Sequence, residues 1–368
     1  MHSSRSRALI GAVLVTFLIA GCTAPGSAST TPTAPAVEDL VPLADLTLLP
    51  DPRNHEGAST AVLAAMSVAP IDGEITPELP ATVTSHDLDG DTEVTVESAD
   101  RIIGLDIAGS IAATLFGLGL GDNVIGRDSS TTFADAMDLP VVTSSGHSIN
   151  SESVIALRPD LVITDGTVGP TDVVLQLRDA GIAVVFVDTD PSIEGVGELA
   201  RQVAAAVGAP DAGETLAARL ADEMVAKVAE IAAIAPADED QKIRMLFLYL
   251  RGSAGIYYLF GEESGADTLI ESLGGVDVAG EIGWSGMKPM TDEALVSANP
   301  DLILVMTDGL ASVGGVDALL ESKPAIALTK AGQNKRFVDM ADGEILSFGP
   351  RASGVLDALA RAIYAPGE

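Results

Sequence analysis

The chain has 368 residues with a formal net charge of −33, which disfavours attraction to nucleic acid or anionic lipid, so we expect no nucleic-acid partner. Hydrophobic residues make up 47% and charged residues 20%, so most of the chain can bury a core and a largely disordered protein is excluded. The length supports about two domains of ordinary size.

Residues 1–21 have the pattern of an export signal. Arg5 and Arg7 precede an apolar run, residues 8–20, that is short for a bilayer span and ends in I-A-G-C. This tetrapeptide resembles the lipobox of bacterial lipoproteins, in which the Cys becomes the new N-terminus and bears lipid. The resemblance implies an exported protein held on the outer face of the cell membrane by lipid on Cys22. An uncleaved anchor with an incidental Cys is the alternative.

Residues 22–98 form a tether and an N-terminal segment of open role. The Ser, Thr, Pro and Ala of residues 23–38 indicate a flexible tether. Further on, Val83 and Val94 flank the acidic sequence D-L-D-G-D at residues 87–91, which predicts a hairpin with an Asp-Gly turn. The three aspartates could instead bind Ca²⁺, but the other positions of an EF-hand loop are missing, so we favour the turn.

From residue 99 on, short apolar strands alternate with Ala- and Leu-rich helices, which is typical of an α/β fold. We predict strands at 102–105, 160–164 and 183–187, and helices at 110–118 and 171–180. A continuous helix is predicted over 211–234, with Asp211 as its N-cap and Pro236 just beyond its end. At about 36 Å, this helix is long enough to bridge two domains.

The two halves of the α/β region repeat one another. The sequence E-S-V-I-A-L-R-P-D-L-V-I from Glu152 returns as E-A-L-V-S-A-N-P-D-L-I-L from Glu293. This long-range repeat predicts two similar α/β lobes joined by a single long helix, with a ligand cleft between the lobes. We expect lobe 1 over 99–209, the linking helix over 210–236 and lobe 2 over 237–368.

These features together resemble the helix-linked substrate-binding proteins of ABC importers, which take up iron siderophores, cobalamin, haem or metal ions. The resemblance covers residues 99–368. Within the group, Ser145-Gly146-His147 and the L-Y-L-R-G sequence at 248–252 are similar to the haem-binding, HmuT-like proteins of actinobacterial uptake systems. That resemblance implies that His147 and Tyr249 bind the iron of haem b from opposite faces and that Arg251 supports Tyr249.

The chemistry of these residues agrees with that role. His147 is the only His within the lobes, and imidazole suits iron or zinc, although a capping or solvated loop His is the alternative. Tyr249 and Arg251 are two residues apart in a predicted strand and therefore share a face. A guanidinium beside a phenol favours the phenolate, a ligand for Fe(III). A half-buried core Tyr with a surface Arg is the alternative.

Other residues are weaker candidates for support of the haem. Tyr257 and Tyr258 could stack on a flat macrocycle, although such a strand more often belongs to a core. The sequence around Met287, Lys288 and Met290 is the lobe 2 counterpart of the His147 loop and could supply a wall and a cation. Because haem propionates need local positive charge, Arg127, Lys288 and Arg351 are their candidate partners, although an isolated cation usually only solvates a surface.

Glu152 and Glu293 occupy matched places in the repeat. The family resemblance implies that one acid on each lobe pairs with arginines of the membrane permease, so we expect docking through these two residues. The alternative is helix capping, because acids are stabilised near a helix N-terminus.

The favoured function is a monomeric extracytoplasmic haem receptor that delivers haem to an ABC permease and its ATPase for iron uptake. An Fe(III)-siderophore or corrinoid receptor of the same fold is the alternative, with His147 and Tyr249 as wall residues. An exported haem-dependent enzyme is disfavoured, since the sequence contains no G-x-S-x-G, H-E-x-x-H or P-loop motif. Two axial ligands would also leave no open iron position for chemistry.

Overall fold

The computed structural model describes residues 40–64, 67–144 and 147–367, all of which fall in one compact unit of the chain. The expected export signal, the tether, the lipidation site Cys22 and the Ser145-Gly146 pair lie outside the described residues. Within the described residues, none of the helices is both long and apolar enough to cross a bilayer.

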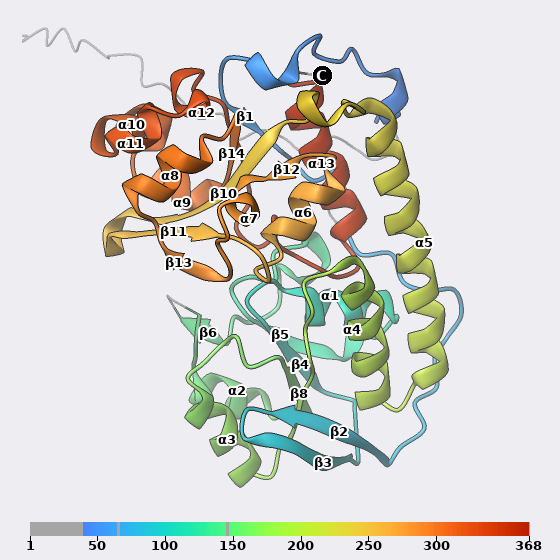
Figure 1. The fold of residues 1–368 in the computed structure, drawn as a ribbon. Helices are drawn as coiled ribbons and strands as arrows, with labels where there is room; N and C mark the ends of the chain where they lie inside the picture. The colour runs from blue at the N-terminus through green and yellow to red at the C-terminus, as the bar shows by residue number, and fades with distance from the viewer. Residues whose placement is uncertain (1–39, 65–66, 145–146, 368) are drawn as a thin grey trace, which may run out of the picture. The chain divides into compact units, whose positions relative to one another are not determined.

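Lobe 1 is built on a parallel sheet of four strands in the order β5-β4-β8-β9 (Figure 1). The strands are β4 Ile102–Leu105, β5 Val124–Arg127, β8 Leu161–Thr164 and β9 Ala183–Phe186. Its helices are α1 Ser110–Gly117, α2 Ser151–Leu157, α3 Thr171–Asp179 and α4 Ile193–Ala206, and a small hairpin pairs β6 Thr143–Ser144 with β7 Ser148–Ile149. The strands β4 and β8 are buried throughout, because α1 and α4 cover one face of the sheet and α2 and α3 the other.

Lobe 2 is built on a mixed sheet in the order β1-β15-β14-β10-β11-β13, with β12 also paired to β10. Its strands are β1 Ser59–Thr60, β10 Arg244–Arg251, β11 Ile256–Phe260, β12 Val276–Asp277, β13 Met287–Pro289, β14 Leu302–Met306 and β15 Phe337–Met340. Its helices are α6 Ala266–Ser272, α7 Val278–Glu281, α8 Asp292–Ala298, α9 Thr307–Ser312, α10 Gly315–Ser322, α11 Pro324–Ala327, α12 Lys330–Gln333 and α13 Ala352–Tyr364. In this sheet only the pairs β10–β11 and β11–β13 are antiparallel. The predicted two-lobe α/β fold is confirmed.

Short 3-10 helices complete the described secondary structure. They lie at Leu43–Asp45, Pro52–Asn54, Gly121–Asn123, Ala134–Ala136, Glu239–Gln241 and Gly252–Ala254.

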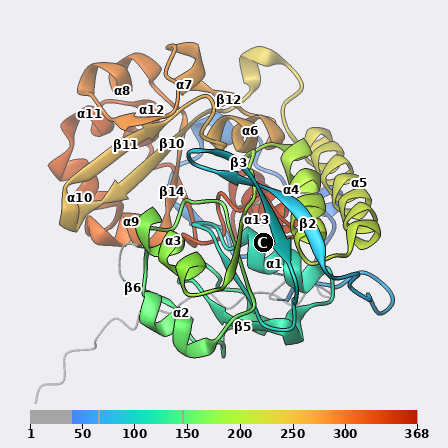
Figure 2. The same ribbon diagram turned by 90° about the horizontal axis from the view of Figure 1, so that it is seen from below.

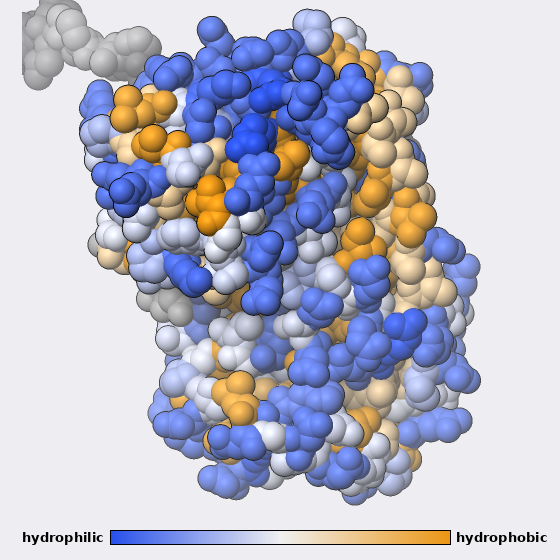
Figure 3. All heavy atoms as spheres, in the orientation of Figure 1, coloured by the Kyte–Doolittle hydropathy of each residue, from blue (hydrophilic) through white to orange (hydrophobic). Residues whose placement is uncertain are grey.

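The predicted long helix is α5, Pro210–Ile234. It packs on α4 of lobe 1 and on α13 of lobe 2, and Figure 2 shows α4 and α5 side by side. The prediction of Asp211 as its N-cap is wrong: Ala209 is the N-cap and Pro210 opens the helix. Proline is tolerated there because its missing N–H would have no partner within the helix. Figure 3 shows apolar side chains over much of this helix, on a face that carries further apolar patches on both lobes.

The sequence repeat has a structural counterpart in each lobe. It begins with α2 before β8 in lobe 1 and with α8 before β14 in lobe 2. Both helices end in a left-handed residue, Arg158 with φ 51° and Asn299 with φ 41°. The Asp of each Pro-Asp pair then joins its strand to an earlier segment of the chain. Asp160 accepts a hydrogen bond from the hydroxyl of Ser98, and Asp301 forms an ion pair with Arg53.

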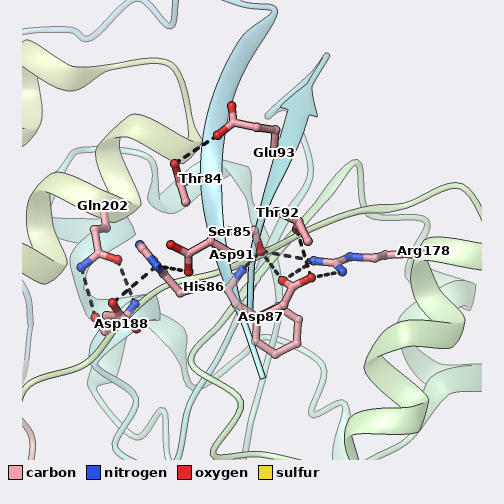
Figure 4. Close-up of polar contacts among 11 residues, drawn as sticks. Thr84, Ser85, His86, Asp87, Asp91, Thr92, Glu93, Arg178, Asp188 and Gln202 are labelled. Carbon is pink, nitrogen blue, oxygen red and sulfur yellow. Dashed lines mark hydrogen bonds and ion pairs between the residues drawn. The ribbon is translucent and has the colours of Figure 1, made fainter. Parts of the chain in front are cut away.

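The N-terminal segment contributes to both lobes. Its strand β1 pairs with β15, and the predicted hairpin is confirmed as β2 Ala81–Asp87 and β3 Gly90–Val96, joined by Leu88 and Asp89. The hairpin packs on β9, where Asp87 accepts two hydrogen bonds from Arg178 (Figure 4). Asp87 therefore anchors the hairpin to lobe 1.

Candidate functional site

A cavity of about 740 Å³ lies between the two lobes. Lobe 1 lines it with the segments that follow β4, β8 and β9, and lobe 2 with β10, β11, β13 and residues 342–348. The carboxyl ends of parallel strands meet at one edge of a sheet, which is where α/β proteins bind ligands. The volume is typical of a site for a cofactor-sized molecule.

Tyr249 near the end of β10 is a wall of this cavity. Its ring stacks on Phe260, with 5.6 Å between the ring centroids and 17° between the planes. The guanidinium carbon of Arg251 lies 4.4 Å from the centroid of the Tyr249 ring. Arg251 thus lies over the ring of Tyr249 and is not itself among the residues that line the cavity.

The neighbouring strand β11 places its two tyrosines on opposite faces of the sheet. Tyr258 pairs with Tyr249 in the antiparallel register and lines the same cavity. Tyr257 pairs with Leu250 and packs against the core on the other face, where the ammonium group of Lys323 lies 3.9 Å from its ring centroid. Because side chains alternate along a strand, the structure brings Tyr258 to the cavity and not Tyr257.

His147 lies on lobe 1, in the turn between β6 and β7, with a left-handed φ of 59°. Its Nδ1 is 3.4 Å from the hydroxyl of Ser130 and 3.5 Å from that of Ser129. The backbone carbonyl of His147 accepts a hydrogen bond from the backbone N–H of Gly169. Thr167, in the same loop as Gly169, lines the cavity. His147 itself is half-buried and is not a lining residue. The structure therefore places His147 beside the loop that lines the lobe 1 side of the cavity, outside the lining itself.

The loop of lobe 2 that we matched to the His147 loop contributes one side chain to the cavity. Met287, at the start of β13, pairs with Phe260 and lines the cavity, with 61% of its surface exposed. Lys288 follows Met287 on this exposed strand, and its ammonium nitrogen lies 3.4 Å from the hydroxyl oxygen of Ser285. Met290 packs against the core on the other face of the sheet. Neither Lys288 nor Met290 is a lining residue.

The structure does not bring the two candidate arginines to the cavity. Arg127 donates to the backbone carbonyls of Asp128 and Thr131. Arg351 is buried and forms an ion pair of 2.6 Å with Glu344. Each guanidinium thus has hydrogen-bond or ion-pair partners within the protein. The sequence pattern did not predict these partners.

Carboxyl groups that we did not predict line the cavity instead, at Asp106, Asp165, Asp190, Glu263 and Asp342. Burial raises the pKa of Asp106 well above its ordinary value, and the charges of Asp128 and Asp165 raise it further. Burial also raises the pKa of Asp165 and of Asp342. The sequence contained one signal for these cavity residues, since an acid directly follows the predicted buried strands, as Asp106 follows β4 and Asp165 follows β8.

Asp106 also has a structural task. Its carboxylate accepts hydrogen bonds from the backbone N–H groups of Ser110 and Ile111, at 2.8 and 3.1 Å, and so caps α1. In the described part of the chain, no group of three or more His, Cys, Asp and Glu side chains is arranged to hold a metal ion.

The two repeat glutamates are exposed in the first turns of their helices, Glu152 in α2 and Glu293 in α8. The capping hydrogen bonds are made by other side chains, Asn150 in α2 and Thr291 in α8. Among the residues that the structure describes, neither glutamate carboxylate has a hydrogen bond or an ion pair. Both remain available to a partner.

Comparison with known proteins gives a consistent result. Residues 107–342 match the model of a family described as periplasmic binding protein. The crystal structure of heme binding protein HmuT is similar, with a TM-score of 0.79 and 39% identity, covering 86% of this chain and 99% of that one. Other crystal structures of HmuT have one His, one Tyr or one Arg replaced by Ala, and that Tyr and Arg are two positions apart.

Two curated relatives broaden this picture. An uncharacterized ABC transporter substrate-binding lipoprotein, YvrC of Bacillus subtilis (strain 168), is 27% identical over 74% of this chain and 82% of its own length. A cobalamin-binding protein of Halobacterium salinarum is 28% identical over 84% of this chain and 85% of its own length.

Proposed function

This chain belongs to the periplasmic binding protein family, and we propose that it captures haem outside the cell membrane and delivers it to an ABC permease for iron uptake. The observation that carries this proposal is Tyr249 at the cavity wall with Arg251 over its ring. The same two residue types, two positions apart, are those replaced in the variants of the heme binding protein HmuT.

The walls of the cavity suit a flat, largely apolar macrocycle. Tyr258, Phe260, Phe348, Met287 and Met306 all line it. Aromatic rings and thioethers offer large, polarizable contact surfaces to such a ligand. Removing the macrocycle from water supplies most of the affinity in this proposal, and the iron ligands supply orientation.

The roles of the individual residues follow from their chemistry. Tyr249 binds ferric iron through its phenol oxygen, and Arg251 stabilises the phenolate. His147 is the proposed second axial ligand, supplied by the other lobe. Its Nδ1 faces the hydroxyls of Ser129 and Ser130, which leaves Nε2 as the ring nitrogen for the iron.

Membrane attachment and delivery belong to the same proposal. Lipid on Cys22 anchors the protein, in agreement with the description of the YvrC relative as a substrate-binding lipoprotein. Glu152 and Glu293 dock to basic residues of the permease, since both are exposed and neither caps its helix. The protein acts as a monomeric binding protein without enzymatic turnover, with lobes at 99–209 and 237–368.

A corrinoid receptor is the second candidate, and the 28% identical cobalamin-binding relative favours it. In that case Tyr249 is a wall residue of the corrinoid site, and neither Tyr249 nor His147 is an iron ligand.

An absorbance titration with ferric haem tests the proposal. We expect saturable one-to-one binding, a changed spectrum in Tyr249→Phe and in His147→Ala, and an unchanged spectrum in Tyr257→Phe. The last variant is a matched control, because Tyr257 is the same residue type on the opposite face of the sheet. If haem does not bind saturably while a corrinoid does, the second candidate replaces the first.

A further inference from the structure

Asp342 holds the guanidinium of Arg251 in place. Its Oδ2 accepts a hydrogen bond of 2.7 Å from Nη2 of Arg251, whose Nη1 donates to the carbonyl of Leu250 at 2.8 Å. With both terminal nitrogens held, the guanidinium faces the ring of Tyr249 at 4.4 Å. The orientation of the cation over the phenol therefore depends on a carboxylate from a distant segment of the chain.

The carboxylate of Asp342 is itself fixed from its other side. Its Oδ1 accepts a hydrogen bond of 2.9 Å from the backbone N–H of Asp308, in the first turn of α9. The side chain is 22% exposed and lines the cavity. Because both oxygens of Asp342 are engaged, Arg251 cannot leave Tyr249 without breaking a partly buried ion pair.

The turn that contains Asp342 is seated on lobe 1. A Cβ added to Gly343 would lie 2.5 Å from the carbonyl oxygen of Ser130, so the two backbones are in direct contact. Four residues further on, the hydroxyls of Ser347 and Ser110 lie 3.1 Å apart. The position of Asp342, and through it that of Arg251, is therefore set by a contact between the lobes.

We infer that Asp342 is a positioning residue of the haem site, which keeps Arg251 over Tyr249 while the phenol binds iron. This inference rests on the proposed function. Asp342 acts through Arg251, since the ion pair places the guanidinium where it faces the phenol. The negative charge of Asp342 partly cancels the positive field of Arg251 at the phenol. The benefit of Asp342 therefore comes from the alignment of the guanidinium and not from its own charge.

A double-mutant cycle tests the inference by measuring haem affinity and the spectrum of the ferric complex in the full chain. Asp342→Ala should weaken haem binding on the order of tenfold and shift the spectrum, as expected for coupled residues in contact. In an Arg251→Ala background the same substitution should change the affinity less than about twofold, because the group through which it acts is absent. Asp308→Ala is the matched control, since it removes a neighbouring exposed carboxyl group and leaves Arg251 paired.

The outcomes separate a positioning role from a structural one. An equal loss of affinity in both backgrounds, or no loss in the wild-type background, would overturn the inference. Unfolding midpoints without haem identify a variant that does not fold, in which case Asp342→Asn enters the same cycle. If wild-type protein does not bind haem, the proposed function fails and the inference fails with it, which is distinct from a cycle without coupling.

Discussion

Gly343 of lobe 2 touches the carbonyl group of Ser130 in lobe 1 so closely that a Cβ at residue 343 would come within 2.5 Å of the oxygen. The hydroxyl of the same Ser130 lies 3.4 Å from Nδ1 of His147. One backbone contact thus joins the segment that holds Arg251 to the segment that faces His147. The two sides of the proposed site are related through this contact.

Gly343→Ala should therefore lower the free energy of unfolding by about 1–3 kcal/mol, because backbone atoms must move apart to admit the methyl group. Chemical denaturation measures this change. The matched control is Gly197→Ala in α4, where a Cβ would meet its nearest atom at 3.5 Å and a helical Ala is favoured over Gly. Equal stability of the two variants would contradict the close contact at Ser130.

Replacing Arg178 by Met should loosen the β2–β3 hairpin. Arg178 donates to both carboxylate oxygens of Asp87, whose side chain is 11% exposed, so the substitution leaves a half-buried acceptor without its charged partner. We expect a loss of about 1–3 kcal/mol in the free energy of unfolding. Arg201→Met, which breaks an exposed pair with Glu214, should cost less than about 1 kcal/mol. Faster proteolysis within the hairpin would locate the effect.

The same pair predicts a pH dependence of stability. The hydrogen bond from Arg178 is the largest cause that holds the pKa of Asp87 below its ordinary value. Because the folded-state pKa is the lower one, the stabilisation is complete above the ordinary Asp pKa of about 4 and is lost as the pH falls through the folded-state value. Wild-type protein should lose more stability than Arg178→Met below about pH 4, as thermal unfolding over a pH series can show. Parallel curves would refute the coupling.

Esterifying the haem propionates should not weaken binding. Among the described residues that line the cavity five are acidic and none is Lys or Arg. We therefore expect the propionates to lie toward solvent, and haem dimethyl ester to bind within about threefold of haem or more tightly. Competition titrations at low and high salt measure this ratio. A loss greater than tenfold with the ester would instead indicate direct recognition of the propionates.

Reversing the charge of both Glu152 and Glu293 to Lys should abolish haem uptake and leave haem affinity intact, because both residues are exposed on helices away from the cavity lining. The readouts are haem-dependent growth and an absorbance titration. Reversal of the exposed Asp222 on the linking helix is the control. Normal uptake in the double variant would rule out docking through these glutamates.

Local sequence patterns predicted several elements of the fold correctly. The hairpin at Ala81–Val96, the buried strands and the long helix at Pro210–Ile234 each depend on periodicity and turn residues within a few positions of one another. The same holds for Tyr249 and Arg251, whose shared side of β10 follows from their spacing alone. The start of the long helix was displaced by one residue, since both Pro210 and Asp211 suit a helix N-terminus.

What the sequence by itself determined is therefore the alternation of strands and helices with several of those elements, the repeat that predicts two lobes, and the Tyr and Arg that share a strand. Only the tertiary structure decided that Tyr258 and not Tyr257 faces the cavity, because this depends on the register of two paired strands. It also decided that Arg351 is paired with Glu344 and that Asp342 holds Arg251. Such contacts join segments distant in the chain, and their geometry is set by how whole elements pack, which no local pattern contains.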